Sequence, residues 1–330
     1  QVAIALKSKF NASAKNAARW LKGAGFSATV TLGPLKAEFS LTGKDAAKFL
    51  KDAGYPAVQV ANALKRTYKA SAANTAKWLK DAGYSVNQTV GALKQAGFTA
   101  IQIAGALKTK LNVGAAQVAS LLKGAGFSAP QVVGALKSKF NASAANAAKW
   151  LEGAGFTATV ALGPLKAEFS LSGKDATKIL KDAGYSANQT AAAIKSKFNA
   201  SGKNAAKWLK QAGFSSGRVA AALKSTFSAS GKNAAKWLKQ AGYSANQIAG
   251  ALKSKFSASG KNTAKWLKQA GFSVNKVAKA LKSKFSATAA NTLRWLHNAG
   301  FTLNDIKNGV KNAYNMSLGA VINLLRSLKL

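Results

Sequence analysis

Apolar residues recur along the whole chain at helical spacing, in short segments separated by small and polar residues. In one representative segment, Ile248, Leu252 and Phe256 follow one another four residues apart, and Trp266 and Ala270 show the same spacing further on. Apolar side chains at such intervals form one face of a helix. The pattern therefore predicts two short amphipathic helices in succession.

Start and stop signals border both helices of this segment. Ser244 with Gln247 three residues later matches a capping box, and Ser259 begins the second helix. Gly271 is then placed to end the second helix in a left-handed conformation, with Phe272 packing back on it. The glycine therefore meets a demand of the backbone, and we do not assign it to ligand binding.

The same two helices recur with a period of 29 residues. The marker is the aromatic or aliphatic residue before a recurrent leucine, found at Trp20, Phe49, Trp78, Leu121, Trp150, Ile179, Trp208, Trp237, Trp266, Trp295 and Leu324. One interval, Trp78 to Leu121, is 43 residues, which is one period plus 14. An extra helix over 83–96 explains it, and a single helix can be inserted only if the two halves of a unit are interchangeable.

Helices of about ten residues are marginal alone in water, so their apolar faces must be buried on neighbouring units. The predicted fold is therefore all-α, an elongated α-solenoid of tandem 29-residue helix-turn-helix repeats. We expect one repeat array over 1–330, made of a partial repeat 1–24, two repeats 25–82, an extra half-repeat 83–96, seven repeats 97–299 and a degenerate capping repeat 300–330. Pro34 and Pro164 fall inside first helices, which we expect to start late or to kink.

The charge balance is far from that of an ordinary soluble domain. Lysine and arginine total 49 against 9 acidic residues, a net charge of +40, and such a field attracts polyanions. A hydrophobic fraction of 48% excludes a disordered basic tail. The absence of cysteine excludes disulfides and thiolate sites, and the longest uncharged stretch, 14 residues over 312–325, is too short to span a membrane.

Lysine recurs at one place in every first helix and forms a stripe on the second helices. We expect these lysines to bind a polyanion: Lys36, Lys65, Lys108, Lys137, Lys166, Lys195, Lys224, Lys253 and Lys282 on first helices, with Lys203, Lys207, Lys210, Lys232, Lys236, Lys239, Lys261, Lys265 and Lys268 on second helices. A solvated helix face is the alternative, but such a face normally carries both signs of charge. The near absence of acids favours binding.

Other candidate sites are weaker. Trp208, Trp237 and Trp266 could stack on bases beside the lysines, although their place next to the core leucine favours core packing. His297, the only histidine, replaces a lysine on the polar face and is expected to be solvated. We find no catalytic set, no phosphate loop and no metal or cofactor site, and expect no enzyme activity and no small-molecule substrate. The segment before the first helix varies most between units. Such variation fits a repeat-by-repeat recognition code, and drift in an unconstrained loop explains it equally well.

The leading hypothesis is a non-enzymatic scaffold that binds DNA, RNA or another polyanion, with nucleic acid favoured, through lysine contacts to phosphates.

The main alternative is a structural stalk, filament or adhesive segment of a large secreted bacterial surface protein, able to self-associate. It rests on internal copying, since 1–55 recurs as 131–185, and on a start within a repeat, which is typical of a piece of a longer array. Localisation stays open between the cell surface and nucleic acid. Membrane disruption by cationic helices ranks last, because stacking consumes the apolar faces.

Overall fold

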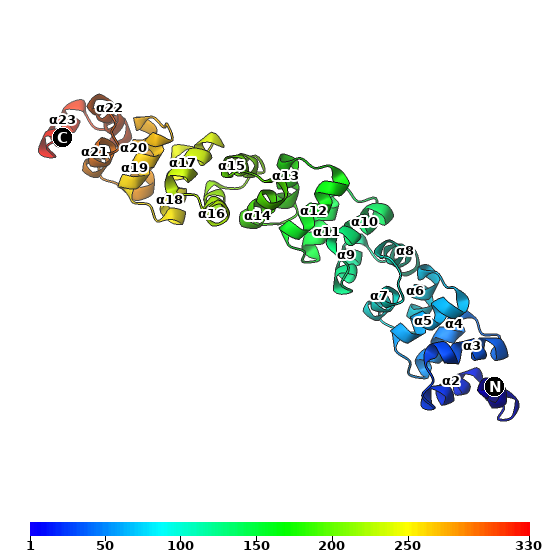
Figure 1. Ribbon diagram of the computed structural model, residues 1–330. Helices are drawn as coiled ribbons and strands as arrows, with labels where there is room; N and C mark the ends of the chain where they lie inside the picture. The colour runs from blue at the N-terminus through cyan, green and yellow to red at the C-terminus, as the bar shows by residue number, and fades with distance from the viewer. The chain divides into compact units, whose positions relative to one another are not determined.

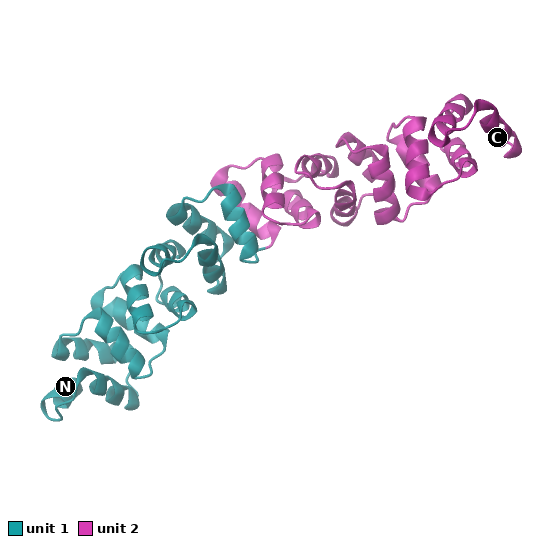
Figure 2. Cartoon of the chain, turned by 180° about the vertical axis from the view of Figure 1, so that it is seen from behind, with its two compact units in different colours: residues 1–156 teal, residues 157–330 magenta.

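A computed structural model describes residues 1–330, which form helices and connecting turns without any strand. The chain divides into two compact units, Gln1–Phe156 and Thr157–Leu330 (Figure 2).

Unit 1 contains eleven helices. They are α1 (Val2–Ser8), α2 (Ala14–Gly23), α3 (Ala28–Phe39), α4 (Gly43–Asp52), α5 (Ala57–Tyr68), α6 (Ala72–Asp81), α7 (Val86–Gln95), α8 (Ala100–Leu111), α9 (Ala115–Gly124), α10 (Ala129–Phe140) and α11 (Ala144–Gly153).

Unit 2 contains twelve helices. They are α12 (Ala158–Phe169), α13 (Gly173–Asp182), α14 (Ala187–Phe198), α15 (Gly202–Gln211), α16 (Ser216–Phe227), α17 (Gly231–Gln240), α18 (Ala245–Phe256), α19 (Gly260–Gln269), α20 (Val274–Phe285), α21 (Ala289–Asn298), α22 (Leu303–Tyr314) and α23 (Leu318–Ser327).

Within each unit the helices follow one another as a tandem stack (Figure 1). Every helix contacts only helices that lie one or two places away in the chain, so each unit has two rows, one of odd-numbered and one of even-numbered helices. Contacts limited to neighbours are the defining property of a solenoid. The predicted all-α repeat fold is confirmed.

Local signals set the helix ends as the sequence predicts. In α18 the Ser244 side chain caps the helix and Gln247 returns the bond to the Ser244 backbone, a complete capping box. At the end of α19, Gly271 takes a φ of +87° and the Phe272 amide donates to the Leu267 carbonyl. This is a Schellman motif, which satisfies carbonyls that would otherwise lack a donor.

First helices end differently, on a left-handed residue that is not glycine. Ser257, after α18, has a φ of +51°, and Asn141 and Asn199 take the same conformation after α10 and α14. Asparagine tolerates this region better than other residues with a side chain. The Asn-Ala-Ser tripeptide is thus a turn: its asparagine ends one helix and its serine caps the next.

The prolines do not delay their helices. Ser27 and Thr157 cap α3 and α12 at the same place as in other units, and both helices run for 12 residues through Pro34 and Pro164. Of the two expected effects, the late start is wrong, and a kink stays a prediction. The cap side chain and the first turn lie upstream of the proline, which lacks a donor only toward the carbonyl four residues earlier.

The extra helix α7 exchanges the two rows of unit 1. Before it, the 12-residue helices α3 and α5 occupy the odd row; after it, the 12-residue helices α8 and α10 occupy the even row. Helix α7 packs on α5, and α8 packs on α6, so neither row is interrupted. A second-helix sequence therefore fits where a first helix would stand, as the insertion requires.

Small residues and leucines fill the space between the rows. Most helices contribute buried alanines and one or two buried leucines or isoleucines, such as Ala234, Leu238, Ala249 and Leu252. Alanine at these positions lets ten-residue helices pack closely and adds no side-chain entropy cost. The lysines are left to the outside of the stack and to the junctions between repeats.

Candidate polyanion-binding surface

The lysines predicted to bind a polyanion divide into two groups in the structure. The first group reaches into the next repeat. In α18, the Lys253 ammonium donates a 2.8 Å hydrogen bond to the Lys284 carbonyl oxygen, and it lies 5.3 Å from the centre of the Phe285 ring. Both acceptors belong to the end of α20, the next helix in the same row.

The same contact recurs in other first helices. Carbonyl oxygens 31 residues later accept from Lys36 (3.3 Å), Lys65 (2.6 Å), Lys108 (2.6 Å), Lys166 (2.9 Å), Lys195 (2.6 Å), Lys224 (2.9 Å) and Lys282 (2.9 Å). Lys137, the remaining predicted first-helix lysine, also has a partner. We call the lysines with this contact the clamp lysines.

Second helices have clamp lysines as well. Lys239 donates to the Gly271 carbonyl oxygen at 2.6 Å and lies 5.2 Å from the Phe272 ring centre. Lys268 makes the equivalent contacts to Gly300 and Phe301, and Lys210 lies 5.3 Å from the Tyr243 ring centre. These three lysines therefore also contact the following repeat.

Two attractions act on each clamp lysine. The carbonyl oxygens at a helix C-terminus carry the negative end of the helix dipole, which favours a nearby cation. The face of an aromatic ring is also negative and attracts an ammonium group within about 6 Å. Much of the positive charge therefore has a role inside the chain, as a link between consecutive repeats.

The second group points outward. Lys203, Lys207, Lys232, Lys236, Lys261 and Lys265 are exposed on α15, α17 and α19, and none of them forms a hydrogen bond, ion pair or ring contact. We call these six residues the outer ladder. Helix α17 contacts both α15 and α19 in a single row of unit 2, so the structure places the six lysines along one row.

No acidic residue accompanies the outer ladder in the sequence around it. Between residues 183 and 304 there are twenty lysines and arginines and no aspartate or glutamate. The second helices α4, α6 and α13 end on an aspartate, and one of these, Asp52, forms a 3.2 Å ion pair with Lys15. The equivalent positions beside the ladder are Gln211, Gln240 and Gln269, which leaves the ladder charges uncompensated.

The tryptophans have the packing role that their sequence position favours. Trp208, Trp237 and Trp266 are half-buried, and each ring lies against the first residue of the preceding second helix. These first residues are Gly173, Gly202 and Gly231. Part of each ring is thereby buried between repeats, and stacking of the exposed part on bases stays a prediction.

His297 is exposed on α21, in agreement with the sequence. The structure brings together no group of three or more metal-binding side chains. No described helix combines the length and the hydropathy that a bilayer crossing requires.

A second regularity of the sequence, besides the lysine stripes, indicates the contacts of the clamp lysines. An aromatic residue follows the first-helix lysine after 32 residues in several repeats: Lys195 and Phe227, Lys224 and Phe256, Lys253 and Phe285. This offset is one period plus three residues, so it brings a lysine to the helix end of the next repeat. A lysine and an aromatic residue that keep such an offset indicate a contact between repeats.

No protein-family model matches this chain, and no curated protein has a significant match to it.

Proposed function

We propose that the protein binds a polyanion, with nucleic acid as the favoured ligand, through the outer ladder of unit 2. The observation that carries the proposal is the set of six exposed lysines without partners in a segment without acids. An ammonium ladder of this kind contacts phosphates in any sequence, so the binding would be positional and non-specific. The clamp lysines contribute to the field and leave the direct contacts to the ladder.

The charge density supports a polymer as ligand. Stacked helices lie about 8–10 Å apart, so each repeat advances by about 10 Å. Duplex DNA presents about six phosphate charges over that distance. Two ladder lysines per repeat, together with the clamp lysines of the same repeat, approach this density.

The binding test is a titration of fluorescent duplex DNA and single-stranded RNA with the protein at low salt, followed by anisotropy. We expect saturable binding, and the logarithm of the affinity should fall linearly with the logarithm of the salt concentration. A folded protein that leaves the anisotropy of both ligands unchanged at low salt would refute nucleic-acid binding.

A second candidate function, a scaffold or filament, is favoured by the clamp lysines. Lysines that link repeats explain part of the positive charge without any external ligand. A scaffold of this kind should associate into longer assemblies, visible by electron microscopy and by sedimentation. Polydisperse fibres without affinity for nucleic acid would favour this function over polyanion binding.

A further inference from the structure

Two grooves of unit 2 occupy equivalent places two repeats apart. The first has a volume of about 530 Å³ and is lined by Lys181, Arg218 and Lys255 among other residues. The second has a volume of about 680 Å³ and is lined by Lys239, Lys276 and Lys279. The three cations of the first groove come from α13, α16 and α18, and those of the second groove come from α17 and α20.

The basic residues of the grooves depart from the repeat pattern. Arg218 and Lys276 stand at the third position of α16 and α20, where α14 and α18 have the capping glutamines Gln189 and Gln247. Both helices lack the capping box. A capping contact is worth about 0.5–2 kcal/mol, and at this position α16 and α20 carry a groove cation in place of that stabilising contact.

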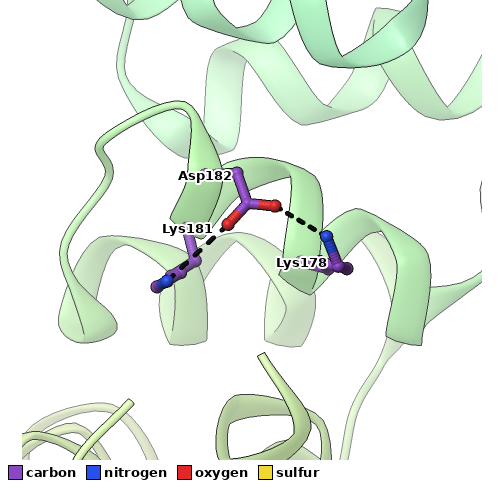
Figure 3. Close-up of polar contacts among 3 residues, drawn as sticks. All are labelled: Lys178, Lys181 and Asp182. Atoms are coloured by element: carbon purple, nitrogen blue, oxygen red, sulfur yellow. Dashed lines mark hydrogen bonds and ion pairs between the residues drawn. The ribbon is translucent and has the colours of Figure 1, made fainter. Parts of the chain in front are cut away.

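The grooves differ in whether a carboxylate stands beside the cations. In the first, Asp182 lies 2.9 Å from the Lys178 ammonium and 3.7 Å from that of Lys181 (Figure 3). The hydrogen bond from Lys178 is the main cause that holds the pKa of Asp182 below its ordinary value. Asp182 therefore remains ionised and offsets the charge of the first groove.

The second groove has a neutral residue in place of that carboxylate. Gln240 stands at the position equivalent to Asp182, and the nearest acidic residue along the chain after the groove is Asp305. Lys276 and Lys279 are exposed, three residues apart on one face of α20, where like charges repel. The cations of this groove are therefore uncompensated, and a bound anion would relieve their repulsion.

We propose that the second groove, with Lys239, Lys276 and Lys279, is a binding site for a single phosphate group. Ser244, Asn246 and Ser283 line the same groove and can donate hydrogen bonds to phosphate oxygens. Lys239 already donates to the Gly271 carbonyl oxygen, and an ammonium group has further donors left for a ligand. The groove uses none of the six ladder lysines, so the proposal stands independently of the ladder.

The test is a titration of the ¹⁵N-labelled protein with inorganic phosphate, with sodium chloride at equal ionic strength as the reference. We expect saturable shifts of the backbone amides of Ser244, Asn246 and Lys276 with phosphate and not with chloride. The double variant K276Q/K279Q should weaken this binding at least about tenfold, as the loss of charge-assisted hydrogen bonds implies. The matched control K261Q/K265Q removes two ladder charges and should leave it unchanged.

The variant Q240D provides a test that keeps every lysine. It copies the carboxylate of the first groove into the second and should weaken phosphate binding several-fold. An oligonucleotide that shifts the same amides would identify the phosphate as that of a polymer, whereas shifts with inorganic phosphate alone would identify a small ligand. Shifts that do not saturate, or an equal loss in K261Q/K265Q and K276Q/K279Q, would overturn the proposal.

Discussion

The ring of Trp208 lies against Gly173, which begins the second helix of the preceding repeat. A Cβ atom at Gly173 would come within 2.6 Å of the ring carbons Cη2 and Cζ3. The same relationship joins Trp78 to Gly43, and it recurs along α15, α17, α19 and α21. Because glycine has no side chain, the tryptophan ring of the next repeat occupies that space. This contact sets how closely consecutive second helices approach.

Replacing this glycine should weaken the junction between repeats. We expect G173A to lower the free energy of unfolding by about 1–2 kcal/mol, because overpacking against the ring outweighs the helix propensity that alanine adds. G217A, in the first turn of α16, has open space around the new methyl group and should raise stability by about 0.5 kcal/mol. Urea unfolding of both variants measures the difference, and equal effects would contradict the packing role of Gly173.

The two groups of lysines should respond differently to the loss of charge. The triple variant K224Q/K253Q/K282Q removes three clamp contacts, each worth about 0.5–1 kcal/mol at exposed sites. K203Q/K232Q/K261Q removes the same charge from the outer ladder and should change stability by less than about 0.5 kcal/mol. Thermal unfolding at one ionic strength compares them. A clamp variant as stable as the ladder variant would show that the clamp contacts contribute nothing.

Most of the fold could be predicted from the sequence because its causes are local. Ser244 and Gln247 cap a helix through contacts within four residues, and Gly271 ends one by its own backbone freedom. The contact partners of the clamp lysines could not be predicted in the same way, because they belong to the next repeat. Lys253 and Lys261 stand on equally polar helix faces, and only the packing of the next repeat separates their roles.

The grooves illustrate a second limit. Arg218 and Lys276 are visible in the variable segment before the first helix, and drift explains such variation equally well. Their meeting with Lys181 or Lys239 depends on contacts between repeats. Sequence spacing alone does not show which side chains of two neighbouring units face the same space.

One buried threonine should be better replaced by alanine. The Thr263 side chain is fully buried and its hydroxyl has no hydrogen-bond partner, whereas Ala205 and Ala234 stand at this position in the two preceding repeats. We expect T263A to raise the free energy of unfolding by about 0.5–1.5 kcal/mol, because an unsatisfied buried hydroxyl is costly. The control is T292A, which removes a hydroxyl bonded to Tyr314 at 2.7 Å and should be destabilising. A loss of stability in T263A would indicate a hidden partner.

The buried tyrosines predict how stability depends on alkaline pH. Burial raises the pKa of Tyr84 from 10.0 to about 12, and its hydroxyl donates to the Tyr55 carbonyl oxygen. Because the folded pKa is higher than the unfolded value, the contribution of Tyr84 is complete below pH 10 and is lost as the pH rises toward 12. In Y84F this part of the decline should be absent. The measurement is the free energy of unfolding of the native protein and of Y84F across that pH range, with tyrosinate absorbance as a second readout. An equal decline in stability in both proteins would contradict the role of Tyr84.

We propose that the outer ladder, and not the clamp lysines, makes the contacts to phosphates. The measurement is the slope of log affinity for duplex DNA against log salt concentration, for the native protein and for the two triple variants that each remove three lysines. The ladder variant K203Q/K232Q/K261Q should lose about 0.9 from the slope for each phosphate contact removed, and the clamp variant should retain the native slope while it remains folded. A ladder variant with the native slope, or a clamp variant that loses as much, would contradict the account.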